Sequence, residues 1–169
     1  MVTIVDGEVT HGKRKKIINI VYMIEIKHLQ GSDIEYKDEV FKLFDEATRY
    51  LTAFKWCKKI LNCWLADGFG YILCIFYFDI MPTPESNADN KLWVIVGDIP
   101  PAYLDTIEYK TANDALSFYC FLMEEWVENV KKGKSVADCY PINVAPTIEH
   151  ANMLETRIKL IKSDFLPYV

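Results

Sequence analysis

Residues 71–80 read YILCIFYFDI, and residues 91–99 read KLWVIVGDI. Both segments are dense in β-branched and aromatic residues, which favour β-strands. The residues between them include two prolines, a serine and two asparagines, a composition typical of a surface loop. We therefore expect two antiparallel neighbouring strands joined by the loop at 81–90. Because residues 72–78 are apolar almost throughout, helices should cover both faces of the sheet.

Segments with the residue spacing of helices precede and follow these two strands in the sequence. From residue 38 to residue 66, apolar side chains recur every three or four positions, which predicts a helix with one buried face. A break near residues 48–52 would divide this segment into two helices. Residues 112–132 and 147–165 show the same spacing, and a helix-stopping glycine or proline follows each of them. These segments supply the helices that the sheet requires.

The N-terminal part of the chain predicts two further strands, at residues 2–9 and 17–26. Residues 1–30 would then form a hairpin beside a main body of residues 34–169. A length of 169 residues suits a single domain. The expected fold is α+β, with a small, mostly antiparallel sheet flanked by three or four helices.

The end of the strand at 91–99 has the most individual sequence of the chain. Gly97 permits an unusual φ or a close approach of the backbone, and Asp98 can cap a following turn. The pair Pro100-Pro101 fixes the direction in which the chain leaves, so a sharp turn is expected here. A functional interpretation places Asp98 and Tyr103 in a polar site at this end of the sheet.

Charge and cysteine usage exclude several classes of protein. The net charge is −5 at pH 7, so a nucleic acid would meet net repulsion, and no nucleic-acid partner is expected. The longest apolar run without charge covers 68–78, whereas a membrane-spanning helix needs about 20 residues, so no membrane segment is expected. Five cysteines without a Cys-x-x-Cys pair fit neither a disulfide framework nor a zinc site. With no export signal at the N-terminus, a cytoplasmic location is expected.

No constellation of residues indicates a chemical reaction. The chain has three histidines, and His150 has no second histidine one helical turn away, so the spacing of metal ligands is missing. The sequence also lacks a Gly-x-Ser-x-Gly elbow, a phosphate-binding P-loop and a Gly-x-Gly-x-x-Gly turn after a strand. We therefore predict no catalytic residue, no metal site and no cofactor.

Residues 92–100 read LWVIVGDIP and are followed by Tyr103. Together with Trp56-Cys57, expected on a helix, and the segments at 112–126 and 154–157, they resemble a family of small uncharacterised bacterial domains. In that family a strand ends in Gly-Asp-Leu/Ile-Pro-x-x-Tyr. The resemblance spans roughly residues 50–169 and implies a fold and a bacterial origin, without catalytic residues. In its size, acidity and aromatic content the chain also resembles bacterial toxin-immunity proteins.

These observations favour a non-enzymatic protein-binding domain. Its form would be a bacterial immunity protein that neutralises a toxin by direct binding. Acidic and aromatic side chains at strand ends and in loops would then meet a basic toxin or enzyme. The candidate binding residues are Asp79, Glu85, Asp89, Trp93, Asp98, Tyr103, Asp105, Glu108 and Tyr109.

Two alternatives stay open at this point. The first is a small enzyme that uses the carboxylates of Asp79 and Asp98 for metal-assisted or acid/base chemistry. Pairing of the two strands would bring these groups together at the open end of the sheet. The second is a small-molecule sensor with a pocket between sheet and helices, for which the chain's many aromatic residues would provide the lining.

Overall fold

The computed structural model describes residues 23–31, 36–70 and 72–169. In these residues five strands form one antiparallel sheet in the order β1-β2-β3-β4-β5, so that β5 is an edge strand. The strands are β1 (Ile24–Glu25), β2 (Cys57–Gly68), β3 (Leu73–Pro82), β4 (Lys91–Gly97) and β5 (Ile99–Asp105). The expected antiparallel pair joined by a loop is confirmed as β3 and β4.

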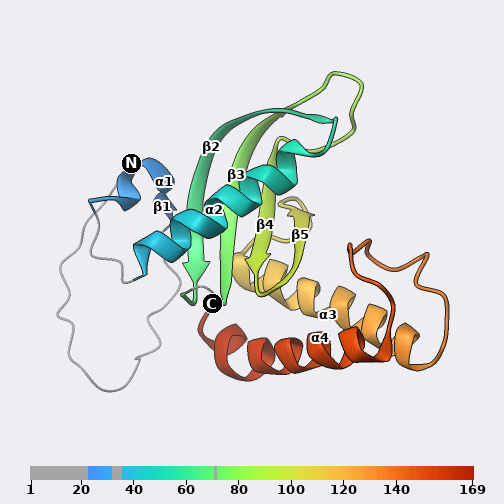
Figure 1. The fold of residues 1–169 in the computed structure, drawn as a ribbon. Helices are drawn as coiled ribbons and strands as arrows, with labels where there is room; N and C mark the ends of the chain where they lie inside the picture. Colours follow the sequence, from blue (N-terminus) through green and yellow to red (C-terminus); the bar gives the residue numbers. More distant parts are fainter. Residues whose placement is uncertain (1–22, 32–35, 71) are drawn as a thin grey trace, which may run out of the picture.

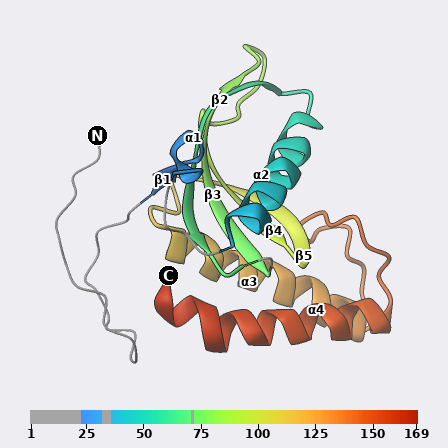
Figure 2. The same ribbon diagram turned by 60° about the vertical axis from the view of Figure 1, so that its left-hand side comes forward.

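Four α-helices accompany the sheet in the described residues. They are α1 (Ile26–Leu29), α2 (Lys37–Thr52), α3 (Ala112–Lys131) and α4 (Ile148–Leu160). A π-helical turn (Ile161–Phe165) and a 3-10 turn (Leu166–Tyr168) continue α4. Figures 1 and 2 show α2 over one face of the sheet, and α3 and α4 together beyond the other. The α+β class is thereby confirmed.

Alternation along β3 explains how one strand serves two cores. Leu73 and Ile75 face the core that α3 and α4 complete. Cys74, Phe76 and Phe78 point the other way and pack in the core beneath α2. All five side chains are buried, which is why this strand reads as a continuous apolar run. The expectation that helices cover both faces is confirmed.

The helix expected over residues 38–66 is wrong in its second half. The helix α2 ends at Thr52, and residues 57–68 form the strand β2 against β3. Irregularities in the β2–β3 register fall between Cys57 and Lys59, between Ile60 and Asn62, and after Leu65. Such bulges interrupt the period of two, and here they leave apolar residues at spacings that imitate a helix. Trp56-Cys57 therefore lies at the start of a strand and not on a helix.

The sharp turn expected at the end of the 91–99 strand is confirmed, but Pro100 and Pro101 lie beyond it in a strand. The chain reverses at Gly97 and Asp98, where Gly97 pairs with Ile99, and both prolines belong to β5. Proline is tolerated there because an edge strand leaves part of its backbone without a neighbouring strand. The backbone N–H of Asp98 donates to the carbonyl of Ile72 at 3.0 Å, which ties the reversal to the start of β3.

The remaining helices follow the sequence closely. The helix α3 begins with a capping box, in which Thr111 and Asp114 each accept the other's backbone N–H. The expected helix at 147–165 is α4 followed by the π-helical turn. Of the expected N-terminal hairpin, the strand at 2–9 lies outside the described residues. In the segment at 17–26, residues 24–25 form β1.

Candidate functional site

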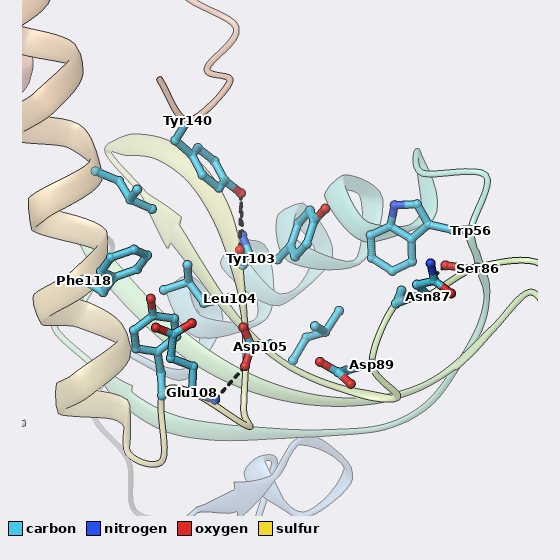
Figure 3. A pocket seen from close by; sticks show the side chains of 14 residues that line it. Trp56, Ser86, Asn87, Asp89, Tyr103, Leu104, Asp105, Glu108, Phe118 and Tyr140 are labelled. Atoms are coloured by element: carbon cyan, nitrogen blue, oxygen red, sulfur yellow. Dashed lines mark hydrogen bonds between the residues drawn. The ribbon is translucent and has the colours of Figure 1, made fainter. Parts of the chain in front are cut away.

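A groove of about 550 Å³ lies along the edge strand β5. The loop between β3 and β4 borders it on one side and the helix α3 on the other (Figure 3). Because β5 has no strand beyond it, side chains from both faces of the sheet reach this groove. The lining residues are Trp56, Ser86, Asn87, Ala88, Asp89, Leu92, Tyr103, Leu104, Asp105, Glu108, Tyr109, Phe118, Leu122 and Tyr140.

Five residues predicted for binding meet in this groove. They are Asp89, Tyr103, Asp105, Glu108 and Tyr109. The pairing of β3 with β4 explains their convergence, because it returns the end of the 81–90 loop to the end of β5. Leu92, three residues after Asp89, is the register partner of Asp105.

The other four predicted residues lie elsewhere. The prediction that Trp93 contacts a partner is wrong. Trp93 is 2% exposed and packs in the core under α3, so a partner cannot reach it. Asp98 is exposed at the β4–β5 reversal and forms an ion pair with Arg157 of α4. Asp79 is half-buried beside Lys91, and Glu85 is exposed on the loop outside the groove.

The proposed approach of Asp79 to Asp98 is wrong. In the β3–β4 register Asp79 lies opposite Lys91, whereas Leu73, at the other end of β3, lies opposite Gly97. Asp79 and Asp98 therefore lie at opposite ends of the strand pair, roughly 20 Å apart at a rise of about 3.3 Å per residue. No common substrate atom or metal ion can contact both carboxylates.

Trp56, which was not among the predicted binding residues, lines one wall of the groove beside Tyr103, and Phe54 and Tyr50 pack behind them. The rings of Phe54, Trp56 and Tyr103 lie 5.2 Å from one another, and Tyr50 packs on Phe54 at the same distance. Phe54 and Trp56 are stacked and the other three contacts are edge-to-face, two geometries that aromatic pairs prefer. Trp56 was placed within the helix expected over residues 38–66, so nothing in the sequence marked it as a groove residue.

Tyr140 closes the groove from a loop far along the chain. Its hydroxyl accepts the backbone N–H of Tyr103 at 3.0 Å and donates to the carbonyl of the same residue at 3.4 Å. It also lies 3.1 Å from the hydroxyl of Tyr50, which can donate to it. Burial is the main cause that raises the pKa of both tyrosines, so both hydroxyls stay protonated at neutral pH. No local sequence signal marks Tyr140, because its role depends on the tertiary fold.

The acidic side of the groove is held by backbone hydrogen bonds. One carboxylate oxygen of Asp105 accepts the N–H groups of Ile107 at 3.0 Å and Glu108 at 2.7 Å. The indole N–H of Trp93 donates to the carbonyl of Tyr109 at 2.7 Å. Burial, and then the nearby carboxylates of Glu108 and Asp105, raise the pKa of Tyr109. The segment 105–109 thus presents its charges from a fixed backbone.

Burial also determines how the fold responds to alkaline pH. It raises the pKa of the Cys74 and Cys120 thiols to about 12, and it raises the pKa of Tyr119. The unfolded chain loses these protons at a lower pH than the folded chain, so a rising pH favours unfolding. We expect the free energy of unfolding to fall from about pH 9 upward, by up to about 1.4 kcal/mol per pH unit for each group. Urea unfolding at about pH 8 and about pH 10.5 measures this, and equal midpoints would contradict it.

The cysteines predict a second measurable property. All five are free thiols with buried side chains. Because a thiolate is the reactive species, burial that raises the pKa of Cys63, Cys74 and Cys120 also protects them. We expect the thiols of the folded protein to react with a chromogenic disulfide reagent at least about tenfold more slowly than those of the urea-unfolded protein. A cysteine that reacts at the unfolded rate under native conditions would contradict its burial.

Among residues 23–31, 36–70 and 72–169, no group of three or more His, Cys, Asp or Glu side chains is placed to hold a metal ion. None of the helices in these ranges combines the length and apolarity needed to cross a membrane. Comparisons with protein-family models, with curated proteins and with solved structures found no match to this chain.

Proposed function

We propose that this chain is a non-enzymatic protein-binding domain whose groove along β5 receives a basic segment of a partner protein. One observation carries the proposal. The groove is lined by three carboxylates and five aromatic rings, and none of its described lining residues is Lys, Arg or His (Figure 3). The residues predicted for binding include all three of these carboxylates.

Charge complementarity at the groove supports this proposal. A cationic side chain in the groove can meet the carboxylates of Asp89, Asp105 and Glu108 while its alkyl stem lies on the rings of Trp56 and Tyr103. Aromatic rings attract a cation through their negative faces, and ion pairs with the partly buried Asp89 and Asp105 are screened less by salt than fully exposed ones. The net charge of −5 adds long-range attraction to the same partner.

In its specific form, the proposal makes the partner a toxin and this chain a bacterial immunity protein that blocks the toxin by direct binding. A toxin with a basic interface should then be neutralised at equal molar amounts, and loss of the groove carboxylates should release it. We also propose the reducing cytoplasm as the location, which the five free thiols support.

An NMR titration tests the groove directly. The probe is an acetylated and amidated peptide of three Arg-Gly repeats, and the matching Glu-Gly peptide is the negative control. We expect the arginine peptide to shift the backbone amide signals of residues 86–89 and 103–109, and about 500 mM salt to weaken the effect. Equal shifts with the glutamate peptide, or shifts confined to other residues, would overturn the proposal.

A pair of charge variants separates the groove from the general charge of the chain. Asp89→Asn combined with Glu108→Gln should weaken the arginine peptide about fivefold to tenfold, because it removes two of the three carboxylates from the groove. The control combines Glu149→Gln with Asp164→Asn, which changes the net charge equally at two exposed positions outside the groove. If both double variants weaken binding by the same factor, only the net charge attracts the peptide and the groove has no role.

A further inference from the structure

We propose that the binding surface prefers arginine to lysine, because three stacked aromatic rings beside the groove form a platform for a guanidinium group. The inference rests on the proposed function and adds the chemical identity of the cation to it. The rings are those of Tyr109, Phe118 and Phe121, which we call the ring ladder.

The ring ladder leads from the groove to the outer surface of α3. The centroids of Tyr109 and Phe118 are 4.5 Å apart, and those of Phe118 and Phe121 are 5.7 Å apart, with 19° between the ring planes in each pair. Tyr109 and Phe118 also line the groove. Phe121 is 57% exposed, so the side of its ring that faces away from Phe118 is accessible from solvent.

A second hollow, of about 420 Å³, surrounds the outer part of the ladder. Glu108, Tyr109 and Phe118 line both hollows, which makes the two a continuous surface. The second hollow adds Asp114 and Ser117 one helical turn before Phe118 and Phe121 respectively. Among the described residues no basic side chain lines either hollow.

This combination of groups distinguishes the two basic residues. A guanidinium group is planar and weakly hydrated, so it can lie flat on an aromatic ring while its edge donates two hydrogen bonds to a carboxylate. An ammonium group is compact and strongly hydrated, and it cannot donate in this paired geometry. Glu108 and Asp114 border the same rings, and because one oxygen of Asp114 already accepts the N–H of Thr111, Glu108 is the carboxylate that can pair with the guanidinium.

The position of the ladder is fixed by the fold and does not depend on a ligand. The carbonyl of Tyr109 accepts the buried indole N–H of Trp93, and Phe118 and Phe121 both belong to the helix α3. A platform whose rings are already aligned loses little conformational freedom when a cation binds to it. The preference for arginine should therefore be a property of the folded chain as it stands.

Two titrations test the preference for arginine. The full chain is titrated with the Arg-Gly peptide and with an equally charged peptide of three Lys-Gly repeats, and the dissociation constants are compared. We expect the arginine peptide to bind about threefold to fivefold more tightly. Its side-chain methylene protons next to the guanidinium group should shift upfield, because they lie over an aromatic ring.

One variant and one matched control make the result specific. Phe121→Leu should bring the ratio of the two dissociation constants to about one and abolish the upfield shift, with the lysine peptide unaffected. Tyr168→Leu replaces another exposed aromatic ring, 58% exposed and outside both hollows, and should leave the ratio unchanged. Equal binding of the two peptides to the unaltered chain, or an unchanged ratio in Phe121→Leu, would overturn the inference. If neither peptide binds, the proposed function itself fails, and the inference fails with it.

Discussion

Replacement of Gly97 by alanine is expected to lower the free energy of unfolding by at least about 3 kcal/mol. Gly97 has a φ of +149°, a value that residues with a side chain rarely adopt. A Cβ atom built there would lie 2.1 Å from the carbonyl oxygen of Ile72 and 2.9 Å from the Cα of Leu73. Both are backbone atoms at the start of β3, so no side-chain rotation can relieve the clash. The strand pair would have to separate at its end.

Urea unfolding of the variant measures this effect, and Gly133→Ala provides the matched control. Gly133 also has a positive φ, of +64°, but no described heavy atom lies within 4 Å of the position of its added Cβ. The control therefore carries the conformational cost alone, about 1 kcal/mol. If both variants lose the same stability, the close approach of Gly97 to β3 is not the cause.

Truncation of Trp93 should have an effect of similar size. Trp93→Ala is expected to cost about 3–5 kcal/mol, because it removes a large ring that is 2% exposed. The ring packs edge-to-face on Tyr77 with 5.0 Å between centroids and lies in the core beneath α3. A cavity at the centre of the sheet cannot be refilled from solvent. A loss below about 1 kcal/mol would show that the core collapses around the gap.

Trp93→Phe separates packing from hydrogen bonding at the same position. Phenylalanine keeps an aromatic ring in the core but cannot donate to the carbonyl of Tyr109. We expect a loss of about 1–3 kcal/mol, from the unmade hydrogen bond and the smaller ring together. Since Trp93 holds Tyr109 at the groove, this variant should also weaken the arginine peptide. An unchanged peptide affinity would show that Tyr109 is positioned by other contacts.

The sequence was informative where local signals and tertiary demands agreed. The strands β3 and β4 combine β-favouring residues with a loop rich in turn residues, and α3 combines helical spacing with a glycine that stops the helix. The strand β2 was missed because its bulges, which depend on pairing with β3, break the alternation that identifies a strand. Propensity within one segment contains no information about such pairing.

Some residues of the candidate site could be predicted from the sequence, and others could not. Asp105, Glu108 and Tyr109 follow one another in the chain, so their proximity could be read from the sequence. Trp56 and Tyr140 reach the groove only through the folding of distant segments. For Asp79 and Asp98 the sequence analysis predicted a proximity that does not exist. The register of β3 with β4 places them at opposite ends of the strand pair. The predicted hairpin already implied this separation, because Asp79 adjoins the 81–90 loop whereas Asp98 lies at the far end of the second strand.

The edge of β5 has a consequence for how this chain behaves at high concentration. Exposed edge strands serve as templates on which other molecules add their own strands, a common origin of aggregation. Pro100 and Pro101 have no N–H to offer, and the hydroxyl of Tyr140 occupies both backbone groups of Tyr103. A second molecule therefore finds no continuous row of backbone partners at this edge. Tyr140, which closes the groove, therefore also helps to keep crowded copies of the chain from joining sheet to sheet there.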